Sequence, residues 1–175
     1  MNILSIGGSN SKISINRQLA NFTASLFEHA EITIVDLSTI NLPIYSVDKE
    51  NEIGIPIEVL TFAHQIDQTD LIIISLAENN GSFNVGLKNL LDWTSRIKDR
   101  KTFNDKNMLL MATSPGARGA ASVMEHAKNV FPHVGANLVA TYSLPNFYQN
   151  FEVGKGITNT PELDKLKIIV SDIKG

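Results

Sequence analysis

The sequence contains no cysteine, and this absence removes several kinds of chemistry at once. Without a thiol the chain can form no disulfide, no thiolate metal site and no redox-active cysteine pair. Any electron transfer by this protein therefore has to use a bound cofactor.

An excess of positive charge is also absent. The 15 Lys and Arg residues are scattered along the chain and are outnumbered by 18 Asp and Glu residues, so the formal net charge is −3. Proteins that bind nucleic acid usually gather basic residues into a patch or stripe. We therefore expect no nucleic-acid partner.

Long apolar runs are missing as well. The longest runs, such as residues 71–74 and 108–112, fall far short of the roughly 20 residues that a helix needs to span a bilayer. The first residues carry neither a basic stretch nor a cleavage site of the secretory type. We therefore expect no membrane partner and a cytoplasmic location.

The four histidines form no metal-binding pattern. They show no His-x-x-x-His spacing and no neighbouring carboxylate of the kind that zinc sites use, so we expect no metal. The chain also lacks the Gly-x-Ser-x-Gly turn that would position a hydrolase nucleophile. A hydrolase is therefore disfavoured.

The chain has enough apolar residues for one sizeable core, since 43% of its 175 residues are hydrophobic. Runs rich in β-branched residues predict strands at residues 2–6, 32–35, 71–75, 108–113 and, more weakly, 138–142. In the first four runs the apolar residues follow one another without alternating. This pattern is typical of parallel strands that are buried on both faces.

Segments with helical periodicity separate and follow these strands, at residues 15–26, 57–66, 87–94, 123–130 and 163–173. Strict alternation predicts right-handed crossovers and a three-layer α/β/α fold around a doubly wound sheet. Such sheets bind ligands beyond the carboxyl ends of their strands, so the loops there form the candidate site. The long irregular stretches 37–55 and 145–160 could be lids, dimer contacts or surface loops.

The loop after the first strand combines glycines, hydroxyls and a cation within residues 7–16. Its amides and the positive end of the following helix favour an anion. Ser9, Ser14 and Asn16 can donate to phosphate oxygens, and Lys12 adds charge. The same residues fit a plain helix start with Ser14 as N-cap, so both interpretations stay open. The loop matches neither the dinucleotide fingerprint nor the P-loop.

Two further strands are followed by polar loops that contain glycine. Residues 77–82 are rich in Asn, Gly and Ser, whose amides can face a planar heterocycle such as a flavin. Residues 113–119 carry glycines that let the backbone approach a flat ligand closely. Each loop alone also fits a polar turn. Because all three loops converge on one edge of the predicted sheet, together they favour a single ligand site.

The ordered motifs of these loops resemble the NADPH-dependent FMN reductase family, which has azoreductase-like, quinone reductase-like and chromate reductase-like members. The family's G-S-x-R-x-x-S-x-N loop is matched at Gly8, Ser9, Ser14 and Asn16. Its P-E-Y-N-x-S-x-P-G-x-L-K-N-x-x-D-W stretch is matched at Glu78, Asn80, Ser82, residues 87–89 and residues 92–93. Its Ser-x-Gly-x-x-Gly turn is matched at Ser114, Gly116 and Gly119, and residues 151–163 resemble its F-x-x-G-x-I-T-[DN] tail.

The chain departs from this family pattern at several positions. Ser11 stands where the family has Arg, and Asn79 stands where it has Tyr. Ala77 replaces the first Pro, and residues 84–85 are Asn-Val in place of Pro-Gly. Lys12 is expected to supply phosphate charge as a point charge in place of the bidentate Arg, which predicts weaker FMN binding.

The resemblance implies one flavodoxin-like domain over residues 1–175, with a five-stranded parallel sheet in the order 2-1-3-4-5. It also implies an oxidoreductase that passes hydride from NADPH or NADH to FMN and on to a small acceptor: a quinone, azo compound, flavin or metal oxyanion. A homodimer or homotetramer is implied too, with residues 87–93 at a subunit contact. The residues that the resemblance and the loops assign to FMN are Ser9, Ser11, Lys12, Ser14, Ile15, Asn16, Glu78, Asn79, Asn80, Gly81, Ser82, Ser114, Pro115, Gly116 and Gly119.

A function without catalysis also stays open. A flavodoxin-like electron carrier would hold FMN without oxidising NAD(P)H, and a cofactor-poor relative would act through partners. Electron carriers usually display a strongly acidic docking face. The modest net charge of −3 argues against a carrier.

Overall fold

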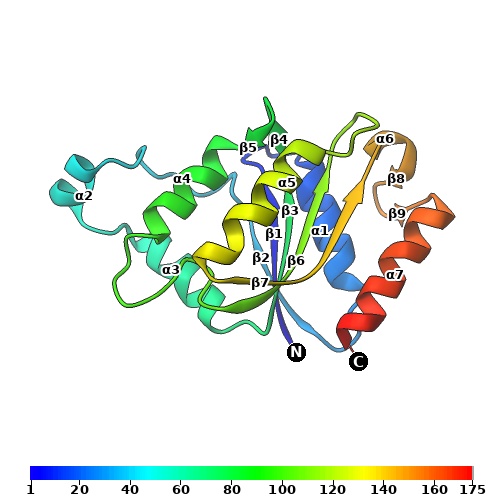
Figure 1. Cartoon of the computed structure of the whole chain (residues 1–175), viewed down its shortest axis with the longest axis horizontal. Helices are drawn as coiled ribbons and strands as arrows, with labels where there is room; N and C mark the ends of the chain where they lie inside the picture. The colour runs from blue at the N-terminus through cyan, green and yellow to red at the C-terminus, as the bar shows by residue number, and fades with distance from the viewer. Residues whose placement is uncertain (175) are drawn as a thin grey trace.

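The computed structural model describes residues 1–174 and shows a parallel sheet between two layers of helices (Figure 1). Its five strands lie in the order β2-β1-β3-β6-β7. The strands are β1 (Asn2–Gly8), β2 (Glu31–Val35), β3 (Leu71–Leu76), β6 (Lys106–Thr113) and β7 (Ala136–Leu144). Numbered among themselves, they follow the order 2-1-3-4-5, so the expected flavodoxin-like arrangement is confirmed.

The helices divide between the two faces of this sheet, because side chains on a strand point alternately to opposite sides. Leu71 and Ile73 of β3 join the core beneath α1 (Ile15–Ser25) and α7 (Thr160–Lys174). Ile72 and Ile74 join the core beneath the helices of the other face. Those helices are α3 (Ile57–Asp67), α4 (Val85–Thr94) and α5 (Ala121–Val130).

The prediction of a buried strand at residues 32–35 is only partly right. The strand exists as β2 and pairs in parallel with β1, Ile6 lying opposite Val35. It stands at the edge of the sheet, however, and Ile34 is 52% exposed. An edge strand has one neighbour, and no helix covers the outer part of β2. The expectation that this strand is buried on both faces is therefore wrong.

The helical period of α3 is confirmed, but its expected buried face is only half right, because the spacing within residues 57–66 predicts that Ile57, Leu60, Ala63 and Ile66 are buried. Ile57 was expected in the apolar stripe and is 69% exposed, and Leu60 is exposed as well. The helix instead buries Val59 and Phe62 together with the expected Ala63 and Ile66. The core packs against the side of α3 that carries Val59 and Phe62, so Ile57 and Leu60 lie on the outer side of the helix.

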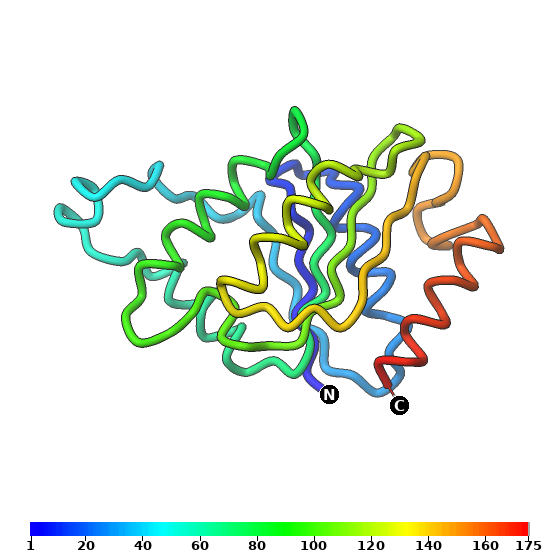
Figure 2. The backbone as a smooth tube through the Cα atoms, viewed as in Figure 1, coloured from blue at the N-terminus to red at the C-terminus, as the bar shows by residue number. Residues whose placement is uncertain are grey.

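The two long irregular stretches contain short elements that the sequence did not predict. The first holds α2 (Val47–Ile53), which buries no side chain and projects to one side of the body (Figure 2). The second holds α6 (Phe147–Asn150), β8 (Phe151–Glu152) and β9 (Gly156–Ile157). A hairpin of β4 (Glu78–Asn79) and β5 (Ser82–Phe83) follows β3, and the 3-10 turn η1 (Phe131–Val134) follows α5. Within residues 1–174, no helix has the length and apolarity to cross a membrane.

The motif residues Asn89 and Trp93 of α4 hold the base of residues 37–55, called the projecting segment below. Trp93 Nε1 donates to the carbonyl oxygen of Pro43 at 2.8 Å, and Asn89 Nδ2 donates to the same oxygen at 3.0 Å. Asn89 Oδ1 accepts the amide of Tyr45 at 2.9 Å. These two residues of α4 therefore serve contacts within the chain.

Candidate functional site

A cavity of about 260 Å³ lies at the carboxyl ends of β1, β3 and β6, where the three polar loops meet. The first loop contributes Ser9, Ser11, Ile13, Ser14, Ile15 and Asn16, the second contributes Ala77 and Glu78, and the third contributes Thr113, Ser114 and Pro115. Tyr148 of α6 completes the lining. Seven of the expected site residues lie outside this lining: Lys12, Asn79, Asn80, Gly81, Ser82, Gly116 and Gly119.

The first loop presents hydroxyls and amides to the cavity. Ser14 is the N-cap of α1, and its hydroxyl oxygen accepts the amide of Arg17 at 3.1 Å. The amides of Ile15 and Asn16, in the first turn, have no partner within residues 1–174, as is usual at a helix start. A serine hydroxyl that accepts one bond can still donate its own hydrogen. Helix capping and anion binding are therefore compatible here.

The side chain of Asn16 is committed to the sheet. It is 3% exposed, and its Oδ1 accepts both the Ser75 hydroxyl at 2.7 Å and the Thr113 amide at 3.1 Å. Its Nδ2 donates to the carbonyl oxygen of Thr113 at 3.3 Å. Asn16 thus joins α1 to the ends of β3 and β6, and its backbone amide is the group left for a ligand.

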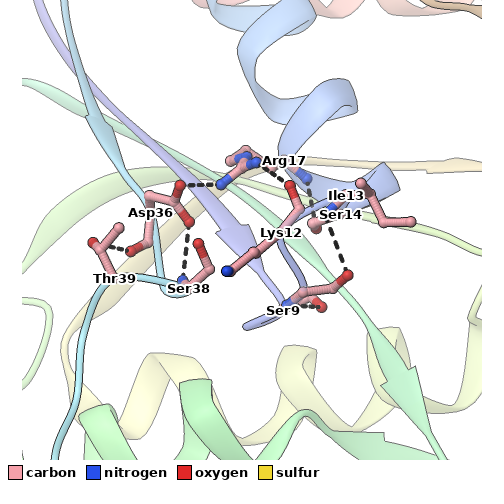
Figure 3. A network of polar contacts seen from close by, with 9 residues as sticks. Ser9, Lys12, Ile13, Ser14, Arg17, Asp36, Ser38 and Thr39 are labelled. Atoms are coloured by element: carbon pink, nitrogen blue, oxygen red, sulfur yellow. Dashed lines mark hydrogen bonds and ion pairs between the residues drawn. The ribbon is translucent and has the colours of Figure 1, made fainter.

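The outer side of the first loop is tied down by Arg17, a residue that the sequence motifs did not single out (Figure 3). Its Nη2 donates to the carbonyl oxygen of Lys12 at 2.6 Å, and its Nη1 forms an ion pair with Asp36. Partial burial raises the pKa of Asp36, but hydrogen bonds from Ser38 and the charge of Arg17 outweigh it and lower the pKa below 3.8. A cation in the first turn of a helix is unfavourable unless an acidic side chain lies nearby. The basic residue at position 17 was therefore the sequence signal that could have indicated such an ion pair.

The second loop is a hairpin with a tight turn. Asn80 and Gly81 form its tip with φ values of 51° and 79°, the left-handed pair that an Asn-Gly turn favours. Glu78 Oε2 accepts the amide of Val123 at 3.0 Å. This bond caps α5, whose own N-cap Ala120 offers no side-chain bond. Glu78 therefore has a structural contact as well as a place in the cavity lining.

The two glycines of the third loop differ in their surroundings. A Cβ on Gly119, which has a φ of 58°, would collide with Ser143 Oγ, so this glycine serves the packing of the loop against β7. A Cβ on Gly116 would meet nothing within 4 Å. Gly116 therefore leaves space beside the loop, whereas Gly119 does not.

Tyr148 and Ile13 form an apolar rim that the sequence analysis missed. They are 72% and 83% exposed. The backbone just before Tyr148 is anchored to the third loop, because the amides of Asn146 and Phe147 donate to the carbonyls of Gly116 and Ser114, each at 3.1 Å. Phe147 is buried, and Tyr148 packs edge-on against it with ring centroids 5.6 Å apart. No pattern within residues 145–160 indicates which of the two neighbouring aromatic residues faces outward.

These groups fit an FMN molecule. Amides and hydroxyls at a helix start suit a phosphate monoester, and an apolar rim beside them suits a planar ring. The one carboxylate in the lining, Glu78, is bonded to the start of α5. Within the part of the chain that is described, no group of three or more His, Asp or Glu side chains is arranged to hold a metal ion.

Comparison with known proteins finds a matching family model and several similar proteins. The family model described as NADPH-dependent FMN reductase matches residues 1–149. The chain is 31% identical over 137 residues to the quinone reductase of Escherichia coli K12, covering 78% of this chain and 72% of that protein. It is 34% identical over 131 residues to a 2-hydroxy-1,4-benzoquinone reductase from a Burkholderia species, covering 74% of this chain and 69% of that protein.

A solved structure agrees with these sequence matches. FerB from Paracoccus denitrificans, a flavoenzyme NAD(P)H:(acceptor) oxidoreductase, superposes with a TM-score of 0.78 at 25% identity. The match covers 98% of this chain and 93% of FerB.

Proposed function

Because the chain belongs to the NADPH-dependent FMN reductase family, we propose that this NAD(P)H-dependent FMN oxidoreductase reduces quinones, acting as one domain over residues 1–175. When bound, FMN supplies the chemistry, which is acceptance of hydride from a nicotinamide and delivery of electrons to the acceptor. The observation that carries the proposal is the cavity in which helix-start amides, serine hydroxyls and an exposed aromatic residue meet.

The first loop is proposed to hold the FMN phosphate. The hydroxyls of Ser9, Ser11 and Ser14 would donate to its oxygens, together with the amides of Ile15 and Asn16. The positive end of the α1 dipole favours the same anion. Lys12 does not line the cavity, and we propose that it acts through its charge at a longer range.

The second and third loops are proposed to hold the flavin ring. Ser114 and Pro115 line the cavity directly, and Gly116 leaves open space beside them. We assign Asn79, Asn80, Gly81 and Ser82 of the hairpin to the same side of the site. Gly119 and Glu78 would contribute chiefly by fixing the shape of the third loop and of the α5 start.

A quinone is the acceptor that the relatives favour, because two of them are named as quinone or benzoquinone reductases. The site is compatible with a flat and weakly polar acceptor, since Ile13 and Tyr148 give the cavity an apolar rim. Quinones are planar and largely apolar, so stacking and burial of apolar area would supply most of their binding energy.

We also propose that the protein forms a homo-oligomer, either a homodimer or a homotetramer. The support is the projecting segment, on which Ile44, Val47 and Ile53 are all exposed large hydrophobic residues. The apolar side of α4 gives less support, because Leu87, Leu90 and Trp93 are already buried within the chain. Light scattering of the purified protein would measure the oligomeric state directly.

The proposed function is tested by the visible spectrum of the purified protein loaded with FMN. Anaerobic addition of NADPH or NADH should bleach the flavin band at about 450 nm, and a benzoquinone added afterwards should restore it. A band that persists after both nicotinamides would identify an electron carrier instead. Failure of a colourless preparation to bind FMN at all would remove the proposed site.

A further inference from the structure

Arg17 contacts three residues around the site at once. Its amide donates to the Ser14 hydroxyl, its Nη2 donates to the Lys12 carbonyl oxygen at 2.6 Å, and its Nη1 pairs with the carboxylate of Asp36. Asp36 directly follows β2, so the guanidinium joins the first loop to a neighbouring strand end. Arg17 itself does not line the cavity.

The backbone of Arg17 is held from the other side by Gly7. A Cβ on Gly7 would lie 2.5 Å from both Cα and Cβ of Arg17, a distance that no real side chain could keep. Gly7 therefore lets the first turn of α1 lie directly against the end of β1. Arg17 is held between Gly7 on one side and Asp36 on the other.

The middle of the first loop has little else to hold it. Ser11 donates its amide to Ser9 Oγ at 3.2 Å, and Ile13 donates its amide to Ser11 Oγ at 3.3 Å. Both bonds span only two residues. Among the described residues, the Arg17 bond to Lys12 is the only hydrogen bond that ties residues 11–13 to a regular element. Without it the loop could adopt other arrangements in which its hydroxyls and amides no longer converge.

We propose that Arg17, anchored by Asp36, is the positioning residue that holds the first loop in the conformation able to bind phosphate. The pair thereby sets the preference of the protein for FMN over riboflavin, which lacks the phosphate. This inference rests on the proposed function. Its physical basis is the population of the binding conformation. If the loop adopts that conformation for only a fraction of the time, the apparent affinity for the ligand is reduced to that fraction of its full value.

A guanidinium suits this role better than an ammonium group. Its two terminal nitrogens point in different directions: here one donates to a carbonyl oxygen on the loop, and the other forms an ion pair with a carboxylate beyond β2. Lysine carries the same charge on one compact centre and cannot present a planar fork. Arg17→Lys should therefore retain only part of the FMN affinity that Arg17→Met loses.

The test measures the affinity of the flavin-free protein for FMN and for riboflavin, by quenching of flavin fluorescence. We expect Arg17→Met to weaken FMN binding by roughly tenfold to a hundredfold, as is usual when charged hydrogen bonds are lost, and to change riboflavin binding by less than about twofold. Arg17→Lys should fall between Arg17→Met and the wild type. Asp36→Asn should also weaken FMN binding more than riboflavin binding.

A matched control is Arg96→Met, which breaks the 2.8 Å ion pair between Arg96, just after α4, and Glu50 on the projecting segment. It should leave both flavin affinities unchanged. Circular dichroism and the thermal midpoint of the flavin-free variants report folding. If Arg17→Met does not fold, Asp36→Asn and Arg17→Lys decide, because each keeps a cation at position 17.

Each outcome is decisive. An equal loss of FMN and riboflavin affinity, or no loss of either, would overturn the positioning role while leaving the proposed function intact. A wild-type protein that binds FMN no better than riboflavin would instead overturn the placement of the phosphate at the first loop, and with it both proposals.

Discussion

Asn79 and Asn84 are hydrogen-bonded to each other, Asn84 Nδ2 donating to Asn79 Oδ1 at 3.2 Å. They occupy positions at which the family pattern has Tyr and Pro, so two departures from that pattern are in contact. Asn84 Nδ2 also donates to Asn10 Oδ1 at 3.2 Å, and Asn84 Oδ1 accepts the amide of Gly86 at 3.0 Å. One side chain thus joins the first loop, the hairpin and the start of α4.

Asn84→Ala should lower the free energy of unfolding by about 1–2 kcal/mol, because it removes a helix cap and two bridging hydrogen bonds. Asn84→Ser should cost less, since a serine can still cap α4 although it cannot bridge the two loops. Urea unfolding of the flavin-free proteins measures both values. Equal stability of the alanine variant and the wild type would show that these amide contacts contribute nothing.

Glu78→Ala should destabilise the protein by about 1 kcal/mol, because the amide of Val123 loses its acceptor at a helix start that has no other side-chain cap. Glu78→Gln keeps an oxygen at the same place and should recover most of the loss. Thermal and urea unfolding of both variants report the difference. A glutamine variant as unstable as the alanine variant would mean that the charge, and not the cap, is what matters.

Asn16→Ala should cost about 2–4 kcal/mol of unfolding free energy, since it leaves the buried Ser75 hydroxyl and Thr113 amide without their acceptor. A loss of flavin binding in this variant would then reflect disorder at the ends of β3 and β6. Combining it with Ser75→Ala should recover about 0.5–3 kcal/mol relative to additivity, because the orphaned hydroxyl is gone. Additive losses would argue that the two side chains are independent.

The strands and the meeting of the loops could be predicted because both follow from local patterns. The run Leu71–Leu76 is buried along its whole length, as continuous apolarity predicts for a central parallel strand. Alternation with helices then determines the edge at which the loops meet. Asn80-Gly81 also carries the usual signal for a hairpin, although we expected a ligand-binding loop or a polar turn there and no strand pair.

Pairings between distant side chains could not be predicted. Asn16 is separated by 59 residues from Ser75 and by 97 from Thr113, and no local pattern distinguishes an Asn that donates to phosphate from one that joins two strands. The ion pair between Arg17 and Asp36 likewise depends on the position of β2 beside β1. Side-chain roles at the site therefore needed the fold. The pattern of apolar residues indicated the strands and their alternation with helices, and the strand order was implied by the family resemblance.

Tyr148→Ala should weaken FMN or quinone binding by roughly threefold to tenfold, the usual value of one aromatic contact, while leaving stability unchanged because the side chain is 72% exposed. Tyr148→Phe keeps the ring and should behave as the wild type if stacking is what counts. Flavin titration and the KM for a benzoquinone separate the two ligands. Unchanged values for both in Tyr148→Ala would remove this residue from the site.

The ion pair of Asp36 with Arg17 should make a pH-dependent contribution to stability. The pKa of Asp36 is lowered in the folded protein from an ordinary value of 3.8, since hydrogen bonds from Ser38 and the Arg17 charge outweigh the effect of burial. A lowered carboxyl pKa stabilises the fold above the unfolded-state pKa, and that stabilisation is lost as the pH falls through the folded-state pKa. Arg17 stays charged throughout, and Glu58 of α3, which lines a cavity shared with Asp36, is the other carboxylate nearby.

The wild type should therefore be more stable than Asp36→Asn by a constant amount between about pH 5 and pH 8, and the two should converge as the pH falls below about 4. Urea unfolding of both proteins across this range measures the difference directly, and subtraction removes the titration of the carboxylates that they share. A difference that stays constant down to about pH 2.5 would mean that the charge of Asp36 is not what holds Arg17, because only a charged carboxylate loses its advantage over an amide on protonation.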